Sequence, residues 1–167
     1  MVLRSTNFKI MGLDMYLYRK EKNDKHVDLG YWRKANHIHK WFVDNVQNGI
    51  DECQESVVSK EQLINLLEIC QKVLEESTLV KGEIENGKQL IGGVWVPIMQ
   101  DGLENKNPSL AEKLLPTQSG FFFGNTNYDE YYINDIKETI SILKPVIATL
   151  DNLNETNSSK VYYRSSW

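Results

Sequence analysis

Strand-like segments stand at both ends of this 167-residue chain, and helix-like segments occupy much of the length between them. Residues 11–18 alternate, with Leu13, Met15 and Leu17 on one side, which predicts a half-buried strand. Residues 161–167 are rich in aromatic and β-prone side chains and predict a second strand. Because no regular alternation of strands and helices is visible, we expect an α+β fold in which these two strands share one sheet.

Three amphipathic helices are expected between the terminal strands. In residues 31–46, apolar side chains recur at spacings of three and four: Ala35, Ile38, Phe42 and Val46. The next helix begins with a capping-box pair, Ser59 and Gln62. The last helix starts from an Asn-x-x-Glu cap at Asn127, and Pro145 is expected to kink it or to start a new segment.

Shorter segments lie between the second and the last of these helices. Residues 81–101 are rich in glycine and predict a hairpin excursion whose tight turn is Asn86-Gly87. Residues 111–115 predict a short helix that is stopped by the following proline. The run Phe121-Phe122-Phe123 is expected to form a central strand, because both of its faces are apolar.

Length and composition fit one globular domain over residues 11–167, with residues 1–10 as an N-terminal extension. We expect a small, mostly antiparallel sheet that includes the N- and C-terminal strands and packs against two to three helices. The formal net charge of -4 disfavours duplex DNA as a partner, because no global positive field is available to displace counterions from its phosphates.

The sequence shows neither an export signal nor an apolar run of membrane-spanning length, so we expect a cytoplasmic protein with no membrane partner. Cys53 and Cys70 lack CxxC spacing, and a reducing cytoplasm should leave both unpaired. His37 and His39 lie two positions apart on the expected helix, which turns their imidazoles about 200° away from each other. We therefore expect no metal site, and the absence of P-loop and dinucleotide motifs predicts no cofactor.

An enzyme is one alternative, although nucleophile motifs such as GxSxG are absent. In that case Asp14, His39 or Asp129 would act as the general base. Asp14 is also explained simply as an acidic residue on the solvent-exposed face of a strand. A short basic stretch is either a local binding patch or a solvated helix face: Arg33, Lys34, His37 and Lys40.

The most informative feature is a set of polar and aromatic residues on elements that the fold can bring together. Aromatic faces stack on bases, guanidinium groups hold phosphate or carboxylate, and amides read polar edges, so the set suits a nucleotide-like anionic ligand. Alternatively, the aromatic residues belong to the core and its rim, and the arginines pair with acids. The expected ligand-binding residues are Trp32, Arg33, Asn36, His39, Gln118, Ser119, Tyr128, Tyr131 and Arg164.

Four strings carry a resemblance: GLDMYL at residues 12–17, YWRKANHIHKWF at 31–42, LLPTQSGFFFG at 114–124 and YYRSSW at 162–167. In this order they resemble a family of small phage and prophage proteins of no established activity. Members commonly begin at the Met-Gly-Leu-Asp string, so residues 1–10 depart from the family pattern. The resemblance implies a phage context, in which small accessory proteins often act by binding.

We therefore expect a phage-associated anti-defence protein in the host cytoplasm, which binds or sequesters a nucleotide-like ligand. A second hypothesis is a blocker that docks exposed aromatic side chains, such as Trp95 and Trp167, on a host defence protein. The third is the small enzyme with Asp14 or His39 as its general base. The sequence leaves open whether the protein is a homo-oligomer.

Overall fold

The computed structural model describes residues 12–152 and 159–167 of the chain. Its elements, in chain order, are β1 (Asp14–Lys20), β2 (His26–Arg33), α1 (Asn36–Asn45), β3 (Ser56–Val58), α2 (Lys60–Glu76), β4 (Leu79–Ile91), β5 (Val94–Asn105), α3 (Ser109–Leu114), α4 (Glu130–Asn152) and β6 (Lys160–Ser166). The N-terminal extension expected at residues 1–10 lies outside the described residues.

A four-stranded antiparallel sheet joins the two ends of the described chain, in the strand order β2-β1-β6-β3. The first strand pairs along its whole length with the last, and Tyr16 lies opposite Arg164. Met15, Leu17 and Tyr163 are buried on one face of this sheet. Tyr16 and Arg164 are exposed on the other. The expected α+β domain, with its N- and C-terminal strands in one sheet, is confirmed.

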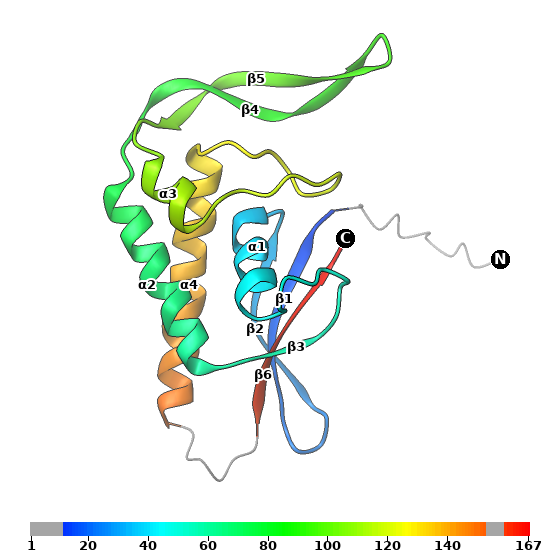
Figure 1. Ribbon diagram of the computed structural model, residues 1–167, viewed down its shortest axis with the longest axis vertical. Coiled ribbons are helices and arrows are strands. Elements are labelled where there is room, and N and C mark those ends of the chain that lie inside the picture. Colours follow the sequence, from blue (N-terminus) through cyan, green and yellow to red (C-terminus); the bar gives the residue numbers. More distant parts are fainter. Residues whose placement is uncertain (1–11, 153–158) are drawn as a thin grey trace, which may run out of the picture.

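The helices cover the buried face of the sheet (Figure 1). The long helices α2 and α4 pack side by side, and α4 also contacts β2. This approach depends on Gly30, because a Cβ atom there would lie 2.5 Å from Cγ2 of Ile142. In the core, the ring of Phe42 on α1 stacks on Tyr163 of β6 with centroids 3.9 Å apart. Within residues 12–152 and 159–167, none of the helices has the length and apolar character needed to cross a membrane.

The first helix begins later than the apolar spacing predicts. Residues 31–33 belong to β2, where Trp32 pairs with Met15, and α1 starts only at Asn36. Lys34 has a φ of 58°, a left-handed conformation that separates the strand from the helix. The predicted capping box of α2 is present, with Ser59 as its N-cap.

Helix α4 is capped by Asp129 rather than by Asn127. Oδ1 of Asp129 accepts hydrogen bonds from two backbone N–H groups in the first turn, as an N-cap aspartate does. Pro145 lies inside α4 and does not start a new segment. The proline leaves the carbonyl of Ser141 without its helical donor, and both residues are exposed, so water can satisfy that carbonyl.

Strands β4 and β5 form a long two-stranded arm, separate from the four-stranded sheet (Figure 1). The sequence pattern predicted a turn at Asn86-Gly87, but the turn of the arm is Gly92-Gly93. Both residues of this turn have positive φ, at 56° and 80°, which the type I′ hairpin turn requires. Asn86-Gly87 instead occupies an irregularity within β4.

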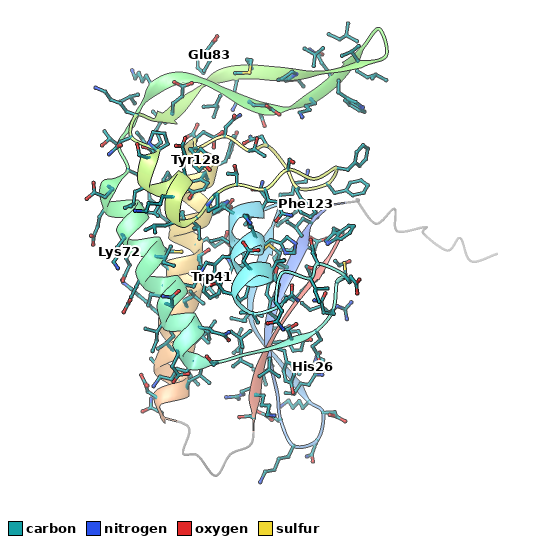
Figure 2. The ribbon with its side chains drawn as sticks, viewed as in Figure 1. His26, Trp41, Lys72, Glu83, Phe123 and Tyr128 are labelled. Carbon is teal, nitrogen blue, oxygen red and sulfur yellow. The ribbon has the colours of Figure 1, made fainter. Side chains whose placement is uncertain are left out.

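The base of the arm packs against the start of α4, whereas its outer part extends away from the body. Ile84 is buried, and the backbone N–H of Asn105 donates to the carbonyl of Tyr128 at 3.1 Å. Nε2 of Gln100 donates to Oη of Tyr131 at 3.0 Å. Beyond these contacts, the tip of the arm stands clear of the rest of the protein (Figure 2).

Candidate ligand-binding pocket

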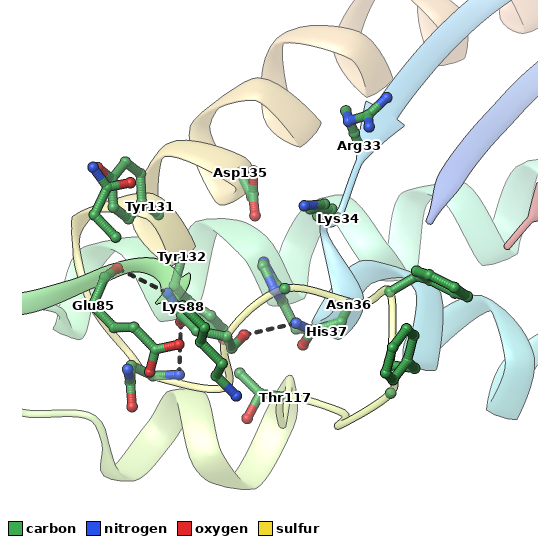
Figure 3. Close-up of a pocket in the computed structure, with 18 residues that line it drawn as sticks. Arg33, Lys34, Asn36, His37, Glu85, Lys88, Thr117, Tyr131, Tyr132 and Asp135 are labelled. Atoms are coloured by element: carbon green, nitrogen blue, oxygen red, sulfur yellow. Dashed lines mark hydrogen bonds between the residues drawn. The ribbon is translucent and has the colours of Figure 1, made fainter. Parts of the chain in front are cut away.

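A pocket of about 520 Å³ lies where the arm, the loop between α3 and α4, and the first turns of α1 and α4 meet (Figure 3). The loop comprises residues 116–129 and is called the 116–129 loop below. Charged, aromatic and amide side chains line the pocket. They include Arg33, Lys34, Asn36, His37, Glu85, Lys88, Phe121, Phe122, Tyr131, Tyr132 and Asp135.

Asn36 shapes the pocket by fastening the 116–129 loop to the start of α1. Its Nδ2 donates to the carbonyls of Phe123 and Asn125, each at 2.9 Å. Its Oδ1 accepts from the backbone N–H of Gln118 at 2.9 Å. Because both donors of the amide are engaged, Asn36 positions the loop rather than a ligand.

The run Phe121-Phe122-Phe123 lies in this loop and not in a central strand. The carbonyl of Phe122 accepts from the backbone N–H of Leu13 at 3.1 Å, and the N–H of Phe123 turns back to the carbonyl of Gly120 at 3.2 Å. The run therefore bends instead of extending. Phe123 is buried in the core, whereas Phe121 is 86% exposed at the pocket.

Three cationic side chains line the pocket: Arg33, Lys34 and Lys88. The guanidinium of Arg33 lies 3.4 Å from Oδ1 of Asp14. Within the described part of the chain, neither lysine forms an ion pair. The left-handed backbone of Lys34 costs a residue with a Cβ roughly 1–2 kcal/mol, and its N–H is held by the carbonyl of Leu13 at 2.8 Å. The charged side chain of Lys34 therefore lines the pocket even though its backbone conformation is strained.

His37 and Asp135 belong to the part of the lining that α1 and α4 supply. His37 is 2% exposed, and its Nε2 has no hydrogen-bond partner among the described residues. Burial lowers the pKa of His37 to about 3, so the imidazole is neutral at neutral pH. Burial, followed by the nearby charges of Glu138 and Asp129, raises the pKa of Asp135 to about 7. Figure 3 shows the carboxylate of Asp135 pointing toward the His37 ring.

Arg33, Asn36 and Tyr131 are the residues of the predicted set that line this pocket. Tyr131 joins the arm to α4 through its bond from Gln100, and Asn36 holds the loop. Of the two arginines in the predicted set, Arg33 lies in the pocket lining and Arg164 does not. The structure does not bring the remaining six residues into the lining.

His39 and Trp32 lie in the core. Nδ1 of His39 lies 2.7 Å from Oη of Tyr163, and its Nε2 lies 2.9 Å from Oδ2 of Asp51, so both ring nitrogens are engaged. Nε1 of Trp32 donates to Oγ1 of Thr139 at 2.9 Å. The side chains of Trp32 and Arg33 lie on opposite faces of the sheet, because residues 31–33 form a strand and neighbouring side chains of a strand alternate between its two faces.

The other predicted ligand-binding residues lie around the pocket or far from it. Gln118 gives its backbone N–H to Asn36, and Ser119 is exposed on the 116–129 loop. Oη of Tyr128 accepts from a backbone N–H of the same loop at 3.2 Å. Arg164 is exposed on the outer face of the sheet, opposite Tyr16 in the register.

The remaining candidate general bases also lie outside the lining. Oδ1 of Asp14 accepts from Oη of Tyr31 and faces Arg33. Asp129 is engaged as the cap of α4. In the described ranges, no group of three or more histidine, cysteine or acidic side chains is arranged to hold a metal ion.

Sequence reasoning did not assemble His37, Lys88 and Asp135 into one site. For Asp135 a signal existed: it lies three residues after Tyr132 and four before Thr139, so helical spacing places it beside a buried stripe. His37 appeared only within a basic stretch. Lys88 had no local signal, because it follows the Asn86-Gly87 irregularity in an exposed strand.

No family model, curated protein or solved structure matches the chain. What the pocket binds is therefore inferred from its own side chains.

Proposed function

We propose that this chain is a binding protein whose pocket holds a small, anionic, nucleotide-like molecule and releases it chemically unchanged. The observation that carries the proposal is the presence of Arg33, Lys34 and Lys88 in the lining of one pocket, in a chain of net charge -4. The lysines have no acidic partner within the described residues, and Lys34 keeps its place on strained backbone. Cations held in this way are suited to bind phosphate or carboxylate.

Two carboxylates in the lining, Glu85 and Asp135, bear on the sign of the ligand. The raised pKa of Asp135, about 7, means that its side chain takes up a proton near neutral pH. An anion bound nearby favours this protonated form, because protonation removes the repulsion between the carboxylate and the anion. The pocket can thus become more positive as an anionic ligand enters.

The aromatic side chains of the 116–129 loop favour a ligand with a flat ring over a bare phosphate. Phe121 is 86% exposed, and its ring stands edge-on to that of Phe122 with centroids 4.6 Å apart. Stacking of a base on an aromatic side chain contributes about 1–3 kcal/mol. A ligand that combines an anionic group with such a ring uses both features.

The resemblance to phage and prophage proteins extends the proposal to a biological role. In a host cell, a protein that binds a nucleotide-like signal without consuming it lowers the free concentration of that signal. We therefore propose an anti-defence role by sequestration. This role requires tight binding and no turnover.

The test is a thermal-shift screen across nucleotides, cyclic oligonucleotides and ADP-ribose derivatives, followed by chromatography of the recovered ligand. For a stabilising compound, Arg33→Ala should weaken binding about thirtyfold, or about 2 kcal/mol, which is the scale of a charge-assisted hydrogen bond. Arg164→Ala is the matched control on the outer face of the sheet and should leave affinity unchanged. A ligand recovered as a converted product would support an enzyme instead.

Lys34→Gly separates binding from folding. Relief of the left-handed strain, about 1 kcal/mol, roughly offsets the added flexibility of glycine, so the free energy of unfolding should change by less than about 1 kcal/mol. Affinity for the compound found in the screen should fall about tenfold with the lost charge. Unchanged affinity in this folded variant would remove Lys34 from the site.

The arm supports a second candidate function, a blocker of a host protein. Its outer half exposes large apolar side chains, which is unusual for a surface that meets only water: Leu90, Ile91, Val94, Trp95, Ile98 and Met99. Trp95 and Trp167 are exposed as the blocker hypothesis requires, although Nε1 of Trp167 donates to Oδ1 of Asp51. If no compound stabilises the protein and a host protein co-purifies with it, this function replaces the first.

A further inference from the structure

One residue of the pocket lining, His37, carries a polar atom that the fold leaves unsatisfied. Nε2 of His37 is buried without a hydrogen-bond partner among the described residues. Buried polar atoms in native proteins are nearly always paired, so an unpaired atom on a residue that lines a pocket indicates a missing partner. The neighbouring ring of Tyr132, with its centroid 4.1 Å away, does not supply one, because its Oη donates to the carbonyl of Leu115.

Asp135 adds a second unpaired group on the same side. It lies one helical turn beyond Tyr132 on α4 and lines the pocket with His37. Its carboxylate makes no hydrogen bond or ion pair within the described residues. In a neutral imidazole, Nε2 is either a donor or an acceptor, and a carboxyl group that gains a proton readily offers both.

We propose that His37 and Asp135 form a recognition site for an uncharged hydrogen-bonding edge with a donor beside an acceptor, the edge that a nucleobase presents. This inference rests on the proposed function of the pocket as an anion site. The ligand binds with its base toward α1 and α4 and with its phosphate toward the exposed Arg33, Lys34 and Lys88. His37 thereby selects among ligands that carry the same charge.

The experiment compares ligands that differ only in the base. Calorimetric titration of the full-length protein uses the four nucleoside 5′-monophosphates and ribose 5-phosphate, which keeps the anion and lacks the base. At least one nucleotide should bind about tenfold or more tightly than ribose 5-phosphate. Equal affinity for all five compounds would overturn the base-recognition site while leaving the anion site standing.

Substitution of His37 tests the assignment of the residue. His37→Phe fills a similar volume and removes the orphan atom, so the free protein should be at least as stable as the parent, whereas the preference for the nucleotide over ribose 5-phosphate should disappear. His37→Gln, which keeps a donor and an acceptor, should retain part of that preference. A buried water that merely satisfies Nε2 would leave the preference intact in His37→Phe, and that result would overturn the proposal.

The outcomes separate this inference from the function on which it rests. If ribose 5-phosphate and all four nucleotides fail to bind the parent protein, both proposals fail. If ribose 5-phosphate binds and His37→Phe alters every affinity by the same factor, the anion site stands and recognition by His37 is wrong. Arg164→Ala, which lies outside the pocket lining, should match the parent throughout.

Discussion

At the scale of single residues, the half-buried carboxylate of Asp135 makes the stability of the fold depend on pH. Its pKa is raised by burial to about 7, above the ordinary value of 3.8. The stability that its protonated form contributes is therefore fully present below about pH 4 and is lost as pH rises through about 7. The charged and titratable groups around it are Glu138 and Asp129 on its own helix, His37, Arg33 and Lys34 across the pocket, and Glu85 and Lys88 on the arm.

Replacing Asp135 with Asn should remove this dependence. We expect the variant to match the parent near pH 4 and to exceed its free energy of unfolding by about 1–2 kcal/mol near pH 8, since one pKa unit corresponds to about 1.4 kcal/mol and the group is partly solvated. Denaturant unfolding at a series of pH values measures the difference. The exposed Glu68→Gln on α2 is the control. A difference that stays constant across the series would contradict the raised pKa.

At the scale of elements, β6 is the strand on which the sheet depends. It lies between β1 and β3, and it carries Tyr163, which is fully buried against Phe42. We expect a chain that ends at Val161 to lose its cooperative thermal transition, because it loses most of the pairing with both neighbours. Circular dichroism during heating measures this loss. A truncated chain that kept its thermal midpoint would show that β6 is dispensable.

The outer part of the arm should be dispensable for folding, in contrast to β6. Leu90 and Trp95 pair across the two strands and are each 59% exposed. Substituting both with Ser should therefore change the free energy of unfolding by no more than about 0.5 kcal/mol, the usual range for surface positions. The same double variant should lose any host protein that co-purifies through the arm. A stability loss above about 2 kcal/mol would mean that these side chains pack against the body of the protein.

At the scale of the whole molecule, the two cysteines differ in burial, so their reactivity probes different parts of the fold. Both are free thiols; Cys70 is fully buried on α2, and burial raises its pKa to about 12, whereas Cys53 is half-buried. We expect a thiol reagent to count two groups in denaturant and to modify Cys53 first in the native protein. Cys70 should react only as fast as the core opens. A count of zero in protein purified without oxidant would contradict unpaired cysteines.

Much of the architecture follows from local pattern. Alternation in the first strand and the apolar stripe of α4 report which face of each element is buried, and the capping box at Ser59 marks where α2 begins; all three predicted their elements correctly. Errors arose where a local pattern admitted two structures. Asn86-Gly87 and Gly92-Gly93 both suit a tight turn, and the pairing of β4 with β5 over the full arm selected the second.

The sequence by itself determined the α+β class and the sheet that contains both terminal strands, and it showed cationic and aromatic residues that the fold could bring together. Only the tertiary structure decided which of those side chains meet. His39 and Trp32 face the core, whereas His37 and Asp135 share a pocket, because the 116–129 loop is held by Asn36 and the arm by its contacts with α4. Periodicity records the burial of each element separately, and it carries no information about hydrogen bonds between residues far apart in the chain.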